Sequence, residues 1–261
     1  MIVVLQKMII MFNIGNISYI LISAILIVLF LMLSNHFVKE QSQKDKLLKF
    51  SALITVIIHY STLYVDYFSS GSATIKNTML LPIYPCNICM WLLVIVAFIK
   101  NRRGRLYNAL SEITFYLGIT GGIIGVLFNE IYISNPTLKD WDVLNGLLSH
   151  STMTFGCLYL LVGKYINIRV SNVISVFYGL LILLIDGMTI IGLYRLCNME
   201  PPNSMYLLEN PFPEIPWFNT VLIGILALII VFMITVVYEE VASIKENRWY
   251  SKIKDSKEKR V

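Results

Sequence analysis

The stretch VLIGILALIIVFMITVVY, residues 221–238, runs for eighteen positions without a charged side chain. A helix of about 20 mostly apolar residues crosses the hydrocarbon core of a bilayer, so this segment predicts a transmembrane helix. Similar apolar segments precede it along the chain. We therefore predict an all-α, polytopic membrane helix bundle with about seven transmembrane helices. The predicted spans are 17–38, 47–69, 78–100, 107–132, 143–163, 170–197 and 217–241.

The composition leaves little material for a soluble domain. The chain has 261 residues, of which 57% are apolar and 14% charged, against roughly 25% charged in soluble domains. We expect one transmembrane domain over residues 1–261. The apolar residues 1–12 are interrupted by Gln6 and Lys7 and lack a cleavage site, so we expect a short interfacial helix rather than a signal peptide.

The basic residues predict the orientation of the chain. Lys and Arg concentrate in the loops that follow the first, third and fifth predicted spans (loops one, three and five) and in the C-terminal tail. The other side carries only Lys7, Lys76, Lys139 and Arg195. Loops on the cytoplasmic side are enriched in Lys and Arg, so the sequence predicts an N-out, C-in topology. The net charge of +5 reflects these loops, and we expect no nucleic-acid partner.

The third predicted span begins TMLLPIYPCNIC, residues 78–89. Its two prolines, Pro82 and Pro85, each remove a backbone donor and clash with the preceding turn. We therefore expect a kinked helix whose freed carbonyls face a cavity or a protein partner. Cys86 and Asn87 lie just past the expected kink.

The fifth predicted span places a histidine at a similar depth. Cys86 and His150 are eight and seven residues into their spans, so both lie roughly 10–12 Å below the outer boundary. A histidine beside a thiol can act as the base that activates it for attack on a carbonyl carbon. His59 of the second span falls within about a turn of the same plane.

Other interpretations of these polar residues stay open. One alternative is that Cys86 is a small buried hydrophobe and that His150 is a structural hydrogen-bonding group. The Cys86–Cys89 pair fits a redox motif or, with His150, a metal site. A transporter or ligand-binding protein would instead line a polar pathway with His59, Asp66, His150 and Asp186. No inverted repeat of the transporter type is visible, and glycines 118, 121, 122 and 125 indicate close helix packing.

Three short motifs resemble a known family. They are Leu81-Pro82-x-x-x-Cys86, the pair Ser149-His150, and Asn203-Ser204-Met205-Tyr206-Leu207 followed by Pro211. In order and spacing the chain resembles the bacterial YwaF-like integral membrane proteins, which are related to the eukaryotic transmembrane protein 164.

The resemblance implies a reaction. The eukaryotic relative is regarded as a cysteine-centred acyltransferase that moves a fatty acyl chain onto a lysophospholipid. On that pattern Cys86 would carry the acyl group as a thioester, and His150 would act as base and then as acid. Asn87 or Asn203 is a candidate oxyanion donor by position, with His59, Tyr84 and Ser149 as supporting residues. The expected partner is a membrane phospholipid or lysophospholipid in a bacterial cell membrane, with no cofactor and no metal; the oligomeric state stays open.

Overall fold

The computed structural model describes residues 13–71, 81–102, 104–129, 131–132, 135–211, 217 and 219–242. In this part of the chain there is no strand, and seven α-helices fall on the seven predicted spans. They are α2 (Ile14–Phe37), α3 (Gln41–Ser70), α5 (Pro85–Phe98), α6 (Arg105–Leu127), α8 (Trp141–Val162), α9 (Ile174–Leu196) and α10 (Thr220–Ala242). The short 3₁₀ helices η1 (Val170–Asn172) and η2 (Ser204–Tyr206) precede α9 and follow it. The predicted all-α class is confirmed.

Five of the helices are long and apolar enough to cross a membrane: α2, α3, α6, α9 together with η1, and α10. The other two differ for separate reasons. Helix α5 has 14 residues, about 21 Å at 1.5 Å per residue, which is shorter than the hydrocarbon core. Helix α8 carries a run of polar residues from Asn145 to Thr154. The chain is therefore a polytopic helical membrane protein. Its orientation stays a prediction, and residues 1–12 lie outside the described residues.

The outer surface is apolar. In α2, Ile25 and Phe30 are 64% and 55% exposed, and in α10 Ile229 and Val237 are 53% and 59% exposed. A soluble protein rarely shows apolar patches of this extent to water. Lipid tails solvate such side chains without penalty, so these faces fit a bilayer.

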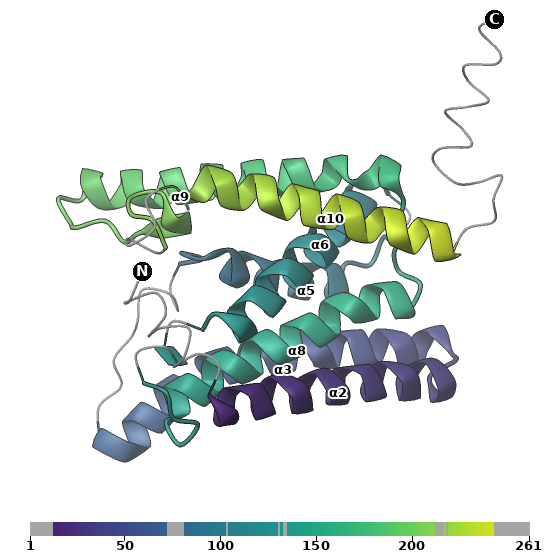
Figure 1. The fold of residues 1–261 in the computed structure, drawn as a ribbon, viewed down its shortest axis with the longest axis horizontal. Coiled ribbons are helices and arrows are strands. Elements are labelled where there is room, and N and C mark those ends of the chain that lie inside the picture. The colour runs from purple at the N-terminus through teal and green to yellow at the C-terminus, as the bar shows by residue number, and fades with distance from the viewer. Residues whose placement is uncertain are drawn as a thin grey trace, which may run out of the picture.

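The helices form three layers (Figure 1). Helices α2 and α3 lie on one side, α5, α6 and α8 lie in the middle, and α9 and α10 cover the other side. Helix α8 packs on α2, α3, α5 and α6. This central position explains how its polar residues are tolerated, because a polar group at membrane depth must find partners within the protein.

Glycines of α6 allow α8 to approach closely. A Cβ atom at Gly118 would lie 2.2 Å from Cys157 Sγ, one at Gly122 would lie 2.1 Å from Thr154 Oγ1, and one at Gly125 would meet the His150 ring. Small residues at such spacing are typical of helix interfaces in membranes. The expected close packing is confirmed for these three positions, whereas Gly121 has no neighbour within 4 Å of an added Cβ.

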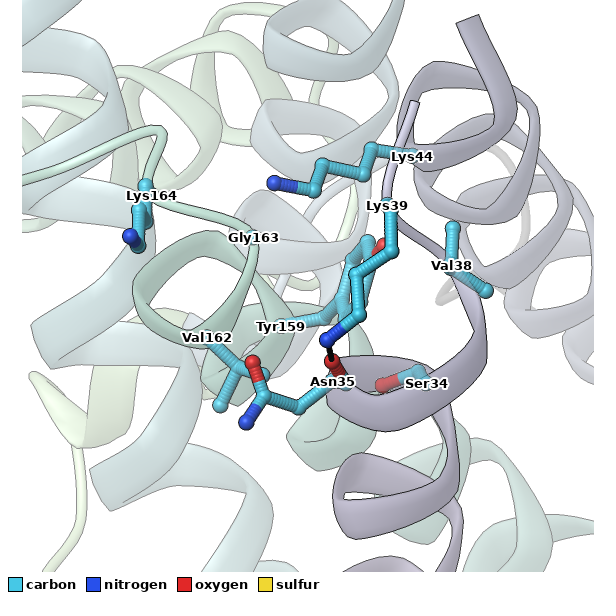
Figure 2. Close-up of a pocket in the computed structure, with 9 residues that line it drawn as sticks. All are labelled: Ser34, Asn35, Val38, Lys39, Lys44, Tyr159, Val162, Gly163 and Lys164. Carbon is cyan, nitrogen blue, oxygen red and sulfur yellow. Dashed lines mark hydrogen bonds between the residues drawn. The ribbon is translucent and has the colours of Figure 1, made fainter. Parts of the chain in front are cut away.

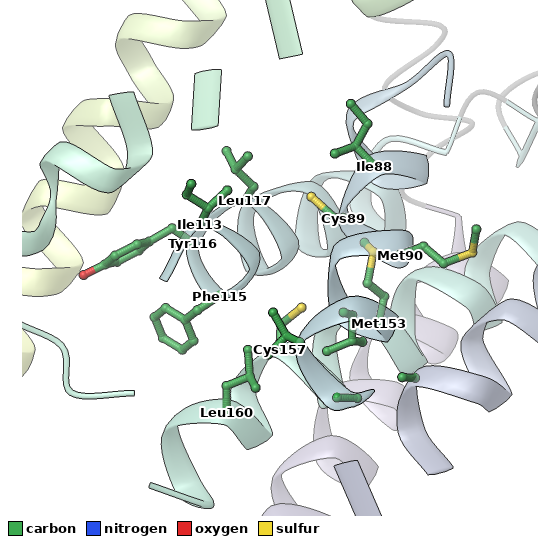
Figure 3. Close-up of a cluster of buried hydrophobic side chains, with 14 of the residues drawn as sticks. Ile88, Cys89, Met90, Ile113, Phe115, Tyr116, Leu117, Met153, Cys157 and Leu160 are labelled. Carbon is green, nitrogen blue, oxygen red and sulfur yellow. The ribbon is translucent and has the colours of Figure 1, made fainter. Parts of the chain in front are cut away.

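The apolar core lies where α5, α6 and α8 meet. Cys89, Cys157 and Leu160 are 0% exposed, and Figure 3 shows their side chains with Phe115 and Met153 around the same space. Because packing here is dense, this core fixes the positions of the three helices that carry the candidate site.

The start of α5 differs from the sequence prediction. The helix begins at Pro85, which occupies the first helical position, and residues 81–84 before it are not helical. Proline suits the first position because its missing N–H would have no intrahelical partner there. The residue before a proline avoids the α region. The expected kink at Pro82 and Pro85 is therefore wrong: the prolines set the amino end of a short, regular helix.

Candidate functional site

Two of the short motifs meet at the amino end of α5. The backbone N–H of Met205 in η2 donates to the Ile83 carbonyl at 2.9 Å, and the Ser204 hydroxyl donates to the same oxygen at 3.1 Å. The rings of Tyr84 and Tyr206 lie with their centroids 5.4 Å apart. Segments about 120 residues apart in sequence thus form one structure around the first turn of α5.

Cys86 is the second residue of α5 and is half-buried against the core. Its neighbour Asn87 is buried and connects two helices. The Asn87 Oδ1 atom accepts from the Tyr84 backbone N–H at 3.1 Å, which turns its Nδ2 atom toward α3. There Nδ2 lies 3.5 Å from Nε2 of His59. The structure therefore brings Tyr84, Cys86, Asn87 and His59 together.

His150 has a different environment. Its Nδ1 atom lies 2.6 Å from the Gly146 carbonyl on the previous turn of α8. Because a carbonyl only accepts, Nδ1 carries the proton and Nε2 is the unprotonated nitrogen of the neutral ring. The ring packs against Gly125 of α6. Among the described residues its hydrogen-bond partner is Gly146 and not Cys86.

Ser149 and Asn203 make local hydrogen bonds. The Ser149 hydroxyl donates to the Gly146 carbonyl at 3.0 Å. The Asn203 Oδ1 atom accepts from the N–H groups of Leu208 and Glu209 at 3.0 and 3.1 Å, and its Nδ2 atom donates to the Glu209 carbonyl at 2.9 Å. Asn203 thereby shapes the loop that follows η2, and both polar atoms of its side chain are engaged within that loop.

The alternatives weighed from the sequence find less support. No three His, Cys, Asp or Glu side chains of the described residues gather closely enough to hold a metal ion. Cys89, the second thiol of the possible redox pair, is 0% exposed. His59 on α3 and Asp186 on α9 lie on opposite outer layers, with α5, α6 and α8 between them (Figure 1). A polar pathway lined by both residues would have to cross this middle layer.

Several polar links of α8 were not singled out from the sequence. The Asn145 amide donates to the Ile58 carbonyl and to the Ser61 hydroxyl of α3. Ser151 pairs with Tyr19 of α2 at 2.9 Å. The signal was the density of small polar residues in α8, which is unusual for a membrane helix. These links hold α8, and with it His150, in place between its neighbours.

A charged cluster occupies the opposite, basic end of the bundle. Asp45 accepts from the guanidinium of Arg102 and, at 2.7 Å, from the hydroxyl of Tyr165, and it precedes the predicted apolar span of α3. Burial alone would raise the pKa of the Asp45 carboxyl. The hydrogen bonds from Tyr165, Arg102 and Gln41, with the charge of Arg102, outweigh burial and lower that pKa.

This cluster joins the three loops that carry the basic residues. Asp45 follows loop one, Arg102 lies in loop three and Tyr165 lies in loop five. The Arg102 guanidinium also lies over the Tyr165 ring, 5.0 Å from its centroid. The three loops thus share one end of the bundle, as the alternating charge pattern requires, away from the end that holds His59 and Asn87.

The fold defines a polytopic helical integral membrane protein. Its candidate site is a small polar cluster at the start of α5, where Asn87 contacts Tyr84 and His59. The chain belongs to the TMEM164 family, whose model matches residues 11–238. The relation to transmembrane protein 164 inferred from the three motifs is thereby confirmed. We find no significant similarity to curated proteins or to solved structures.

Proposed function

We propose that the protein transfers a fatty acyl group between membrane lipids through a thioester on Cys86. The observation that carries the proposal is the placement of this thiol. It is half-buried in the first turn of α5, beside Asn87, whose amide lies 3.5 Å from His59 Nε2. Membership of the TMEM164 family adds support, because transmembrane protein 164 is regarded as a cysteine-centred acyltransferase.

The proposed reaction has two steps. In the first, a histidine takes the proton of Cys86, the sulfur attacks the ester carbonyl of a phospholipid, and the C–O bond breaks as the histidine returns the proton to the leaving alkoxide. In the second, the hydroxyl of a lysophospholipid loses its proton to the histidine and attacks the thioester. The new ester forms, and the Cys86 thiol is regenerated with that proton.

Two histidines are candidates for the base. The resemblance assigns the role to His150, and its unprotonated Nε2 is suited to accept a proton. His59 is the histidine adjacent to Asn87, the neighbour of Cys86. The Asn87 amide is the proposed donor to the oxyanion, because its Nδ2 hydrogens lie on the same turn as the thiol.

The test is intact-mass spectrometry of the purified protein after incubation with phospholipid, before and after neutral hydroxylamine. We expect a mass gain of one fatty acyl group that hydroxylamine removes. Cys86→Ser should lack the hydroxylamine-sensitive adduct, whereas Cys197→Ser, which alters an exposed thiol, should keep it. A folded wild-type protein that forms no adduct with any common phospholipid contradicts the proposal.

A second comparison separates the bases and the redox alternative. The rate of adduct formation is measured for His150→Gln and for His59→Gln. The substitution that removes the base should slow adduct formation by about 10²–10⁴-fold. Cys89→Ser should retain the adduct if only Cys86 reacts. Equal loss in Cys86→Ser and Cys89→Ser would favour a dithiol reaction over acyl transfer.

A further inference from the structure

A cavity of about 110 Å³ lies at the basic end of the bundle, between the end of α2, the start of α3 and the end of α8. Lys39, Lys44 and Lys164 line it, each from a different one of these segments, and no carboxylate does (Figure 2). Three ammonium groups around one space, without an acidic lining residue, produce a positive potential that attracts an anion.

The positive charge of these lysines is not cancelled within the described structure. Lys39 Nζ donates to the backbone carbonyl of Asn35 at 2.6 Å, which holds it at the cavity without neutralising it. Lys44 and Lys164 have no ion-pair partner among the described residues. The carboxylate of Asp45, next to Lys44 in sequence, instead accepts hydrogen bonds from Arg102 and Tyr165.

A buried hydroxyl supplies a second, independent indication of a ligand. Tyr159 lines the cavity and is 1% exposed, and its hydroxyl has no hydrogen-bond partner among the described residues. Figure 2 draws its ring behind the Lys39 side chain, among the residues that line the cavity. Buried hydroxyls in proteins are almost always paired. A ligand oxygen in this cavity would complete the hydrogen bonding of Tyr159.

The backbone places Lys164 at the cavity in an uncommon conformation. Its φ is 66°, in the left-handed region that L-residues other than Asn and Asp seldom occupy. Lys164 follows Gly163, the C-cap of α8, and glycine is the usual residue at the position after the cap. A lysine is held there although glycine would fit with less strain.

We propose that this cavity binds a phosphate group, with Lys39, Lys44 and Lys164 as counter-charges and the Tyr159 hydroxyl as a donor. Basic pockets between transmembrane helices on the cytoplasmic side are suited to phosphate head groups of anionic lipids. The lipid-facing α2 borders the cavity and would lie along the acyl chains of such a lipid. Soluble phosphate offers the same oxygens. The site is separate from Cys86 and does not depend on acyl transfer.

The test is native mass spectrometry of the full chain in mixed micelles with equal amounts of phosphatidylglycerol and phosphatidylcholine, with a parallel calorimetric titration of inorganic phosphate. Four variants are compared with the wild type: Lys39→Gln/Lys44→Gln/Lys164→Gln together, Lys164→Gln alone, Tyr159→Phe, and Lys46→Gln. The last removes an exposed charge of α3 that does not line the cavity.

We expect the wild type to retain phosphatidylglycerol in preference to phosphatidylcholine. Tyr159→Phe, which removes only the hydroxyl, should weaken binding about tenfold, the typical worth of one charge-assisted hydrogen bond. The triple variant should lose binding, and Lys46→Gln should match the wild type. If millimolar inorganic phosphate does not displace the bound phosphatidylglycerol, the ligand is a lipid head group. If inorganic phosphate binds in the titration and the triple variant loses that binding, the ligand is soluble phosphate.

Three results would overturn the proposal. One is equal retention of the two lipids, together with no measurable heat of phosphate binding in the titration. Another is binding that persists in the triple variant. The third is a loss in Lys46→Gln as large as that in Lys164→Gln, which would indicate general charge attraction instead of a built site. Circular dichroism of each variant establishes that the helices are intact.

Discussion

At the scale of single residues, the roles of the two candidate histidines depend on their surroundings. His150 has its Nδ1 proton committed to Gly146, and its ring fits against α6 only because Gly125 has no side chain. His59 faces the Asn87 amide instead. Both residues share a depth in the sequence-based topology, yet they contact different helices.

Gly125→Ala tests the position of His150. A Cβ at this site would lie 2.3 Å from His150 Nε2, so the ring or the helix must shift. We expect a loss of about 1–3 kcal/mol in stability, as for other overpacked cores, and a slower acyl-transfer rate if His150 is the base. Thermal unfolding in detergent and the rate of thioester formation measure the two effects.

The matched control is Gly121→Ala on the same helix, where an added Cβ meets nothing within 4 Å. Its stability should stay within about 1 kcal/mol of the wild type, because alanine is the better helix former. Equal destabilisation by the two substitutions would contradict the described packing of α6 on α8.

At the scale of elements, the start of α5 is the clearest example of local sequence rules. Tyr84 precedes the helix in an extended conformation, Pro85 occupies the first position, and η2 packs on residues 83–84. Such an anchored terminus keeps Cys86 and Asn87 in a defined orientation, which a kink within a longer helix would not.

Pro85→Ala distinguishes the two descriptions of this element. At the first helical position alanine fits nearly as well, so we expect a change in stability of less than about 1 kcal/mol. At a kink in a helix interior, replacing proline would remove a clash and alter stability by about 3 kcal/mol. Thermal unfolding midpoints, with circular dichroism to follow helix content, decide between these outcomes.

At the scale of the whole molecule, the ends of the bundle differ in charge. Lys39, Lys44 and Lys164 gather at one end around a cavity, and the Asp45–Arg102–Tyr165 cluster lies beside them. The exposed apolar faces of α2 and α10 fit lipid between the two ends.

The Asp45 cluster makes stability depend on acid. The folded state lowers the pKa of Asp45. The stabilisation of the fold by the ionised Asp45 carboxylate is therefore fully present above the ordinary aspartate pKa near 4. It is lost as the pH falls through the lower folded value. We expect unfolding midpoints to fall in this acid range and the decline to be weaker in Asp45→Asn. An identical acid response in wild type and Asp45→Asn would show that the cluster contributes nothing.

The predicted orientation is tested with Cys197, an exposed thiol that follows α9. An N-out topology places this residue on the outer side. A membrane-impermeant maleimide should therefore label it in right-side-out vesicles, and Cys197→Ser should abolish that label. Labelling confined to inside-out vesicles would reverse the topology.

The sequence by itself determined the class of fold, the positions of the seven helices to within seven residues at each end, and the gathering of basic loops at one end. These features depend on the hydropathy and charge of contiguous segments. Both are properties of each segment's own sequence and need no contact with other helices. The three motifs also indicated the TMEM164 relation, which the family match over residues 11–238 confirms.

Only the tertiary structure decided which polar residues meet. Matched depth left the rotation of each helix undetermined, and rotation places His59 beside Asn87 while His150 packs on Gly125. It also placed η2 on the start of α5 and enclosed the Tyr159 hydroxyl among lysines. Such contacts depend on side-chain packing between helices that are distant in sequence, and no periodicity along one helix encodes them.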